Sequence, residues 1–350
     1  MSLEVTARAL ESLTAQDIAA VPTAVVERIS GAREVLTVCH ENPEADALGS
    51  ALALALAVEQ LGGRATPVCS DPVPQMYDFI PGMQRFRQDP EPGRQYDLIV
   101  VGDCGDLERV GPVLARQRQL FAEVPIVNID HHISNSGFGE IDWIDPAAAA
   151  TCEMVSLLLP ALGLPLDAAD GAIAANLLAG LVIDTANFQH PNTTPRTLRV
   201  AAELVGVGAP LPETARRLYR TKPNAQLKLF GLVLARLESE LEGRLVWTVL
   251  RQSDFVQTGT AAEEAEGLSD LLSHSDTGQL IILFKEAEQQ TRLSVRTKDG
   301  GLDATRLTGE FGGGGHARAA GATVDAPLDQ AVETVLAAAR RLLHSGAGGR

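Results

Sequence analysis

The sequence predicts an α/β fold, in which a doubly wound, mostly parallel sheet is followed by a second, smaller α/β domain. Short apolar runs recur at 35–39, 64–69, 97–102 and 124–129, with helical or loop segments between them. Strands that alternate with helices are typical of a parallel sheet with right-handed crossovers. A segment rich in Gly and Pro at 206–212 then precedes a new set of strands, and a length of 350 residues suits two domains.

The elements of the first domain follow from where these runs begin and end. We expect this domain over 1–205, a linker over 206–225 and the second domain over 226–350. The expected elements of the first domain are one or two helices before residue 30, a strand at 35–39, a helix after Ser50, a strand at 64–69, a proline-rich loop at 70–92, a strand at 97–102, a helix at 107–118, a strand at 124–129, a polar loop to 146, and helices at 147–162 and 167–180.

The second domain shows a different pattern, with strands that follow one another closely. The helical period of residues 225–242 predicts a helix there, and strands are expected at 245–250, 279–285 and 291–297. The glycine run that ends at His316 is expected to continue into an Ala-rich helix, which would bring backbone N–H groups close to a ligand.

The composition excludes several classes of protein. A formal net charge of −16 argues against a large non-specific contact with duplex nucleic acid, which needs several Lys or Arg contacts to phosphates. No apolar run approaches the ~18 residues of a membrane span, and the N-terminus has no signal-peptide core. The four cysteines are scattered, which fits reduced thiols better than disulfides. We therefore expect a cytoplasmic protein that does not contact membranes.

Imidazoles and carboxylates directly follow three of the apolar runs in the first domain. Because the strand ends of a parallel sheet point the same way, these groups should converge on one edge of the sheet. The groups are His40, Glu44 and Asp46 after the first strand, Asp103 after the third, and Asp130, His131 and His132 after the fourth.

Two features of this pattern stay open at the level of the residues. Asp184 follows a comparable apolar run, but this run continues from a helix, so the strand-end argument does not fix its position. The stretch 40–50, taken alone, fits a metal site and an N-capping loop with solvated acids equally well.

The chemistry of the strand-end groups favours a pair of metal ions. Carboxylates and imidazoles without thiolates suit a hard or borderline cation such as Mn²⁺ or Mg²⁺. Four carboxylates carry a charge of about −4, which two divalent ions would neutralise and one would not. Two such ions ~3.5–4 Å apart are a common device for attacking a phosphorus ester.

Four motifs of the first domain contain the strand-end groups and Asp184. They are His40-x-Asn42-Pro43-Glu44-x-Asp46-Ala47-x-Gly49-Ser50, Asp103-Cys104-Gly105-Asp106, Asp130-His131-His132 and Asp184-Thr185-Ala186-Asn187-Phe188. The C-terminal part adds Arg292-x-Ser294-x-Arg296 and Gly312-Gly313-Gly314-Gly315-His316. Together these motifs resemble those of the DHH/DHHA1 phosphoesterase family, the RecJ-like group, over about residues 35–325.

The resemblance implies a role for each residue of the cluster. Residues 1–205 would be the DHH catalytic domain with a di-metal site, and 226–350 the DHHA1 substrate-binding domain. His132 would face the substrate phosphate, and Asp130 would orient an imidazole. One metal would take His40, Glu44 and Asp103, and the other Asp46, Asp103, His131 and Asp184, with Asp103 as the bridge and a catalytic residue.

Glu44 departs from the family pattern, which usually has Asp at this position. The Glu side chain is one methylene longer, so its oxygen reaches about 1.5 Å further. Metal–ligand distances tolerate only ~0.2 Å, so the loop must shift or the first metal must bind differently. We expect the first metal site to be weaker or altered, with activity kept.

In the second domain the resemblance implies contacts to the substrate. Arg292, Ser294 and Arg296 alternate along one strand, so the two arginines share a face that suits a phosphate fork; a solvated strand face is the alternative. Among the arginines the resemblance favours Arg296. The glycine run would help to hold the base and sugar, through Gly313, Gly314, Gly315 and His316.

The implied function is that of a Mn²⁺-dependent phosphoesterase, with Mg²⁺ or Co²⁺ as alternative ions. It would act as a 3′-to-5′ exoribonuclease on short oligoribonucleotides and dinucleotides such as pApA, releasing 5′-mononucleotides. It would also act as a phosphatase on adenosine 3′,5′-bisphosphate (pAp). The alternatives are a cyclic di-AMP phosphodiesterase, an inorganic pyrophosphatase and a non-catalytic nucleotide sensor. Short nucleotides, not long duplex DNA, are the expected partners, and a homodimer is also considered.

Overall fold

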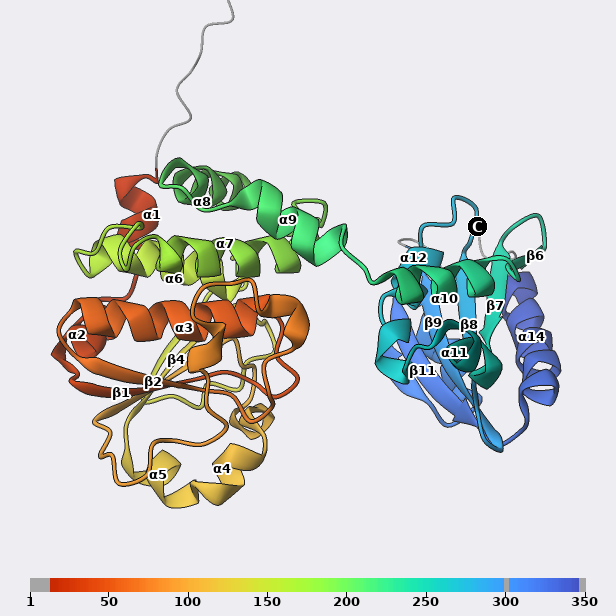
Figure 1. Cartoon of the computed structure of the whole chain (residues 1–350), viewed down its shortest axis with the longest axis horizontal. Coiled ribbons are helices and arrows are strands. Elements are labelled where there is room, and N and C mark those ends of the chain that lie inside the picture. The colour runs from red at the N-terminus through yellow and green to blue at the C-terminus, as the bar shows by residue number, and fades with distance from the viewer. Residues whose placement is uncertain (1–12, 299–301, 346–350) are drawn as a thin grey trace, which may run out of the picture. The chain divides into compact units, whose positions relative to one another are not determined.

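The computed structural model describes residues 13–298 and 302–345 and confirms the predicted fold class. The chain divides into two compact units, and the boundary between them along the chain lies between Thr221 and Lys222 (Figure 1). The N-terminal unit contains a five-stranded sheet, and the C-terminal unit a six-stranded sheet. The segment predicted as a linker, 206–225, includes a helix at Leu211–Tyr219. Within the described residues, no helix is both long and apolar enough to cross a membrane.

The sheet of the N-terminal unit is entirely parallel and has the order β2-β1-β3-β4-β5. This is a doubly wound order, in which the chain changes direction between β1 and β3. The elements of this unit are α1 (Ala15–Ala19), α2 (Thr23–Gly31), β1 (Glu34–Val38), α3 (Ala45–Gln60), β2 (Arg64–Val68), η1 (Gln75–Tyr77), η2 (Met83–Arg85), β3 (Leu98–Gly102), η3 (Leu107–Val110), α4 (Pro112–Arg116), α5 (Arg118–Glu123), β4 (Ile126–Asp130), β5 (Ile141–Ile144), α6 (Thr151–Ala161), α7 (Ala172–Asp184), α8 (Pro195–Gly206) and α9 (Leu211–Tyr219).

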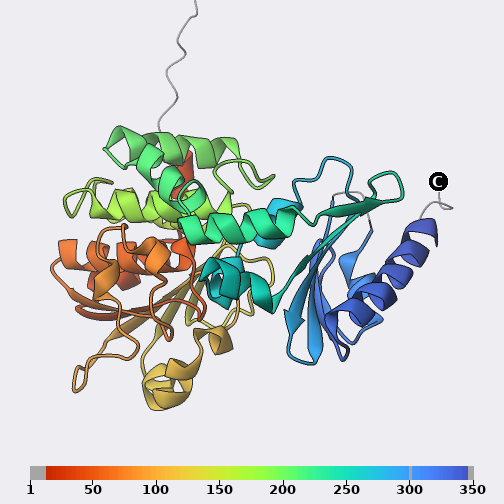
Figure 2. The same ribbon diagram turned by 45° about the vertical axis from the view of Figure 1, so that its right-hand side comes forward.

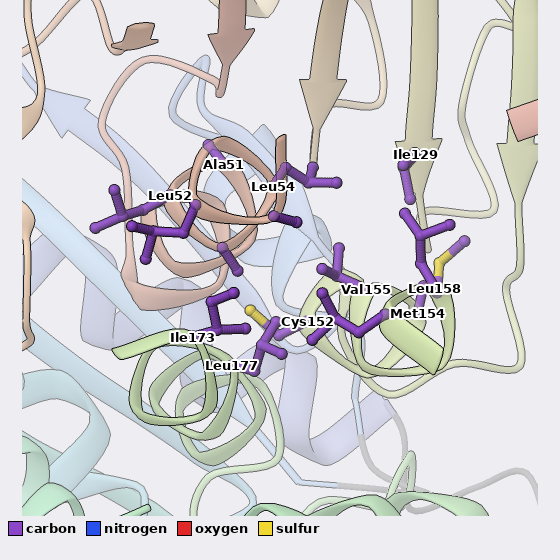
Figure 3. Packing of buried hydrophobic residues seen from close by; sticks show 14 of the residues in the cluster. Ala51, Leu52, Leu54, Ile129, Cys152, Met154, Val155, Leu158, Ile173 and Leu177 are labelled. Carbon is purple, nitrogen blue, oxygen red and sulfur yellow. The ribbon is translucent and has the colours of Figure 1, made fainter. Parts of the chain in front are cut away.

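Helices cover both faces of this sheet. Alternate residues of β1 and β3 enter two separate apolar clusters, one shared with α4 and α5 and the other with α3, α6 and α7. Helix α3 is buried almost along its whole length because α7 packs on it as a further layer (Figure 1). Figure 3 shows part of this core, with Ala51, Leu52 and Leu54 of α3, Ile129 of β4, Cys152, Met154, Val155 and Leu158 of α6, and Ile173 and Leu177 of α7.

The C-terminal unit has a mixed sheet with the order β10-β11-β9-β8-β7-β6, in which only β7 and β8 run parallel. Helices α13 and α14 pack on one face, and α10 and α12 on the other. Figure 2 shows α14 (blue) and α10 (green) on opposite sides of this sheet. Its elements are α10 (Asn224–Leu234), β6 (Glu238–Glu240), β7 (Leu245–Leu250), α11 (Gln252–Thr258), η4 (Ala262–Ala265), α12 (Leu268–Leu272), β8 (Leu280–Ala287), β9 (Gln290–Thr297), α13 (Ala304–Gly309), β10 (Gly314–His316), β11 (Ala319–Val324) and α14 (Leu328–Ser345).

The single helix expected over 107–118 is divided into η3, α4 and the start of α5. Three other sequence-based expectations about elements are wrong. Residues 141–144 form an edge strand, β5, because Ile141 and Trp143 pair with β4, where a loop was expected. The helix expected over 225–242 ends at Leu234, and 238–240 instead extend the sheet as β6.

The third error concerns the glycine run, which leads into a hairpin of β10 and β11 and not into a helix. Residues 319–324 pair along their whole length with β9, so the strand ladder satisfies their backbone groups. Gly313 packs so tightly on this hairpin that a Cβ atom there would lie 2.2 Å from the carbonyl oxygen of Gly321. The glycines therefore permit a close approach of backbones within the sheet.

Candidate metal centre

The carboxyl edge of the parallel sheet carries the predicted cluster. His40 lies two residues after β1, Asp103 directly follows β3, and Asp130 is the last residue of β4. The first two therefore flank the point between β1 and β3 where the strand order reverses, which is the usual ligand site of such sheets. Asp184 reaches the same edge from the end of α7.

Asp103 lies at the centre of the cluster, and its two oxygens face two different sets of groups. Its Oδ2 is 3.5 Å from His40 Nε2, and its Oδ1 is 3.5 Å from His131 Nε2. The backbone of Asp103 is left-handed, with φ of 56°, which is uncommon for a residue other than glycine and clusters at functional sites. Among the described residues, three groups each have their ligand atoms within 4.8 Å of one another. They are His40, Glu44 and Asp103; Asp46, His131 and Asp184; and Asp103, His131 and His132.

Asp46 is fully buried in the first turn of α3 and is held by the start of α6. Its Oδ2 accepts the N–H of Thr151 at 2.7 Å, and its Oδ1 accepts the N–H of Cys152 at 2.8 Å. The hydroxyl of Thr151 also donates to Asp103 Oδ1 at 3.1 Å. Gly180 of α7 makes this packing possible, because a Cβ atom there would lie 2.6 Å from Asp46 Oδ1.

Glu44 combines two roles at the start of α3. It is the N-cap residue, and its Oε1 accepts the N–H of Ala47 at 3.1 Å. Its Oε2 lies 3.2 Å from His40 Nε2. The Glu side chain therefore reaches both the helix end and the first group of ligands.

His132 is oriented from behind by a buried carboxylate. Its Nδ1 lies 2.7 Å from Asp130 Oδ1, and Asp130 is fully buried. The amide of Asn135 donates to Asp130 Oδ2 at 2.6 Å and fixes that carboxylate in turn. The imidazole of His132 is partly exposed, so its Nε2 is the ring atom left to face a ligand.

Two of the acids in the cluster, Asp46 and Asp184, are poor at holding their charge without a cation. Burial and then the charge of Asp103 raise the pKa of Asp46 to about 7. Burial, followed by the charges of Asp46 and Asp103, raises the pKa of Asp184 well above its usual range. Burial would also raise the pKa of Asp103, but contacts with His131 and His40 hold it well below its usual range.

The pKa values of the histidines in the cluster are raised as well, which favours their charged form. Burial alone would lower the pKa of His40, but its contacts with Asp103 and Glu44 raise it to about 10. For His131, Asp103 likewise overcomes burial and raises the pKa to about 9. Protons thus compensate the buried acids, and divalent cations could do so instead. This set of oxygen and nitrogen donors therefore fits divalent metal ions.

The C-terminal unit contains a hollow of about 500 Å³ beside the predicted arginine strand. Lys285 and Arg292 line it and face each other across the β8–β9 pair. Burial, and then the charges of Arg296 and Arg292, lowers the pKa of Lys285. The other lining residues are Leu293, Ser294, Phe311, Gly312, Gly313, Gly321, Ala322 and Thr323.

The remaining residues predicted to bind substrate are placed differently. Arg296 does not line the hollow, and its Nε donates to Asp270 of α12 at 3.2 Å. Gly314, Gly315 and His316 form β10 and are exposed. Among the residues predicted in this unit, Arg292, Ser294 and Gly313 are the ones that line the hollow.

Several residues of these sites were missed from the sequence. Lys285 could have been found, because pairing of the predicted strands 279–285 and 291–297 as a tight hairpin brings its position opposite Arg292. Asn135 had a weaker signal, as a polar residue three positions after His132. The contacts of Thr151 and Cys152 to Asp46 come from backbone N–H groups, so residue type could not reveal them.

Comparisons with known proteins agree with this organisation. The model of the DHH family, N-terminal domain, matches residues 34–183, and that of the DHHA1 domain matches residues 245–345. A Thermus thermophilus protein named bifunctional oligoribonuclease and PAP phosphatase NrnA is 34% identical over 320 residues, which cover 91% of this chain and 92% of that protein. A Bacillus subtilis protein of the same name is 27% identical over 314 residues, which cover 86% and 93%.

A solved structure extends the likeness to the fold of the whole chain. The crystal structure of an exopolyphosphatase-related protein from Bacteroides fragilis matches with a TM-score of 0.79 at 21% identity, covering 95% of this chain and 98% of that one. The two domain matches cover the N-terminal and then the C-terminal unit, and the Thermus relative covers most of the chain at 34% identity. Together they show the family as well as the fold. The chain therefore belongs to the DHH family, in the form that carries a C-terminal DHHA1 domain.

Proposed function

We propose that this protein is a two-metal phosphoesterase that degrades short oligoribonucleotides to 5′-mononucleotides and removes the 3′-phosphate of pAp. The observation that carries the proposal is the cluster around Asp103, whose two oxygens face His40 on one side and His131 on the other. Relatives that match over most of the chain are named oligoribonuclease and PAP phosphatase, which supports this choice of substrates.

The residues of the cluster would hold two divalent ions, for which we favour Mn²⁺. His40, Glu44 and Asp103 would take one, and Asp46, Asp103, His131 and Asp184 the other, in keeping with two of the three groups of nearby ligand atoms. When bound, such ions lower the pKa of a water and offset the charge of a phosphate ester.

His132 is our candidate for the group that acts on the substrate. Its contact with Asp130 raises its pKa, so it is suited to carry a proton at Nε2. From this atom it can donate a hydrogen bond to a phosphoryl oxygen or a proton to the leaving oxygen. Asp130 fixes the ring orientation and Asn135 fixes Asp130, so both act through His132.

The hollow of the C-terminal unit is our candidate for a second anion site. Two cations that face each other across a strand pair repel one another, and a bound phosphate would relieve this repulsion. Arg292 forms no ion pair with a carboxylate within 13–298 and 302–345, whereas Arg296 pairs with Asp270, so the Arg292 guanidinium is available for such a group. Arg296 and His316 remain candidates for further contacts to the nucleotide.

A substrate panel with purified full-length protein tests the proposal. Mn²⁺-dependent release of AMP should be fastest from pApA and a five-nucleotide RNA, pAp should lose phosphate, and chelation of the metal should stop every reaction. Faster hydrolysis of cyclic di-AMP or of pyrophosphate would point to a cyclic-dinucleotide phosphodiesterase or a pyrophosphatase. Nucleotide binding without turnover in Mn²⁺ would identify a sensor and contradict the proposal.

Two further expectations concern location and partners, and the same preparation tests those about partners. We propose that the protein acts in the cytoplasm, which the four buried, unpaired cysteines support. Retardation of a long DNA duplex at physiological salt would contradict the preference for short substrates. Sedimentation of the protein at several concentrations decides whether it forms a homodimer.

A further inference from the structure

The segment 148–152, which runs from the loop after β5 into the first turn of α6, contacts the ligand group of Asp46, His131 and Asp184 from behind. Besides the two N–H groups that Asp46 accepts, the hydroxyl of Thr151 reaches Asp103, and the carbonyl of Ala148 lies 3.3 Å from His131 Nδ1. The amide of Asn192 bridges this segment to Asp184 of the same group, because it donates to the backbone carbonyls of Ala149 at 3.0 Å and of Asp184 at 3.2 Å.

These contacts are unequally distributed over the cluster. Every ligand of the group formed by Asp46, His131 and Asp184 has a contact to segment 148–152, directly or through Asn192. His40 and Glu44 have none with this segment among the hydrogen bonds of the described residues; their side-chain hydrogen bonds go to the backbone of Glu41 and Ala47. The shape of segment 148–152 therefore concerns one metal position far more than the other.

A buried ion pair holds the segment in this shape. Glu153 is fully buried, and its Oε2 accepts the N–H of Ala149 at 3.2 Å and the hydroxyl of Thr197 at 2.7 Å. Its Oε1 accepts Nε–H of Arg196 from α8. The same guanidinium donates through Nη2 to Asp145 Oδ2 at 2.8 Å. Arg196 thus joins the residues on both sides of segment 148–152.

Burial of this ion pair destabilises the folded protein unless each charged group has its partner. A carboxylate at this depth stays charged only when it is paired and hydrogen-bonded, and removal of its partner leaves an uncompensated buried charge. The apolar faces of α6 and α8 already pack into the core through residues such as Val155 and Val200. A neutral residue would serve that packing equally well, so packing alone does not explain a charged pair here.

We infer that Arg196 and Glu153 are positioning residues that hold segment 148–152 in the shape that the metal position of Asp46, His131 and Asp184 requires. The inference rests on the proposed two-metal function. Neither residue touches a ligand of that position, and both act through the backbone of Ala149 and its neighbours. Loss of the pair should weaken one of the two metal positions and leave the other almost unchanged.

Calorimetric titration of the full-length protein with Mn²⁺, checked by electron paramagnetic resonance of the free ion, tests this inference. Wild type should bind two ions. Arg196→Met should bind one of them with unchanged affinity and the other about 10- to 100-fold more weakly, the usual range for loss of a group that orients metal ligands. Arg196→Lys should show a smaller loss. An ammonium keeps the positive charge, but it cannot reach both carboxylates as the guanidinium fork does.

Two further variants keep the test decisive. Arg196→Met/Glu153→Gln removes the uncompensated charge, so it should fold even where Arg196→Met does not, and it should show the same selective loss. Arg236→Met is the matched control, because Arg236 forms a two-bonded pair with buried Asp254 in the C-terminal unit, at 2.6 and 2.7 Å. It should lower the melting temperature and leave both Mn²⁺ affinities unchanged.

Other outcomes would overturn the inference. Equal weakening of both positions, or unchanged affinities with a lower melting temperature, would mean that the pair serves stability alone. Binding of a single Mn²⁺ by the wild type would also overturn it. Because the readout is ion binding, a protein that binds two ions but does not cleave pApA would refute the proposed function and leave this test intact.

Discussion

The acidic cluster of the N-terminal unit and the basic hollow of the C-terminal unit are built in opposite ways. Asp46 and Asp103 are buried, each lies at the end of a strand or helix, and each is held by hydrogen bonds. Lys285 and Arg292 instead project from an antiparallel strand pair, and Arg292 is exposed. Rigid, buried groups suit chemistry that depends on geometry, whereas cations that line an open hollow suit affinity for an anion. Mutations in the two regions should therefore affect different kinetic constants.

The strongest way to break this comparison is Asp103→Asn. The change keeps the shape of the side chain but removes the charge that faces both groups of ligands, so kcat for pApA should fall by about 10³-fold or more. Steady-state kinetics measures the fall in kcat, and a Mn²⁺ titration measures how the variant binds the ions. Asp329→Asn, at an exposed position, is the control and should behave like wild type. Loss of less than tenfold for Asp103→Asn would contradict the central role of this carboxylate.

A second prediction concerns pH and applies to the acidic cluster alone. In the metal-free protein His40 and His131 have raised pKa values, about 10 and about 9, so their contribution to stability is complete below the unfolded value of about 6.5. It is lost as the pH rises towards 9–10. The metal-free protein should therefore melt at a lower temperature at pH 9 than at pH 6.5.

Metal affinity should change in the opposite direction over the same range. A metal ligand must be a neutral imidazole, so Mn²⁺ competes with protons, and each imidazole should contribute about tenfold in affinity per pH unit below its pKa. The melting temperature gained on adding Mn²⁺ should thus rise from pH 6.5 to pH 9. If the melting temperature gained on adding Mn²⁺ stays constant over this range, the raised pKa values of His40 and His131 are contradicted.

The basic hollow should respond in KM. Removal of the Arg292 guanidinium or the Lys285 ammonium should raise KM for pAp by about tenfold, the loss of one charge-assisted contact, and change kcat little. Arg296→Ala is the matched comparison on the same strand, and its pairing with Asp270 predicts less than a threefold effect. A larger effect at Arg296 than at Arg292 would support the preference that the sequence suggests.

The contrast between the two regions also explains how far sequence reasoning reached. Residues such as His40 and Asp103 were predicted to meet because the ends of parallel strands share one edge, a rule that needs only the pattern of apolar runs. The place of Asp184 was left open by that rule, since it ends helix α7 and reaches the edge from a further layer.

In the C-terminal unit the same reasoning failed at the glycine run. Glycines followed by small residues look alike before a helix and in a hairpin, and the pairing of 319–324 with β9 decides between them. This pairing joins distant segments and is not visible in local composition. The support of Asp46 by N–H groups and of segment 148–152 by Arg196 could not be predicted for a similar reason, because those contacts join residues that lie far apart in the sequence.

Glu44→Asp should give the smallest effect and refine the comparison within the acidic cluster. Asp caps helices at least as well as Glu, so the melting temperature should not fall. The shorter side chain can still accept a backbone N–H, but its second oxygen must sit closer to its own backbone than the one that now lies 3.2 Å from His40 Nε2. The affinity for one Mn²⁺ should therefore change several-fold while hydrolysis of pApA continues, a small effect that follows from the ~0.2 Å tolerance of metal distances. Identical affinities and rates in the two proteins would mean that the backbone around Glu44 already absorbs the extra methylene, and that the first metal position is as well formed as the second.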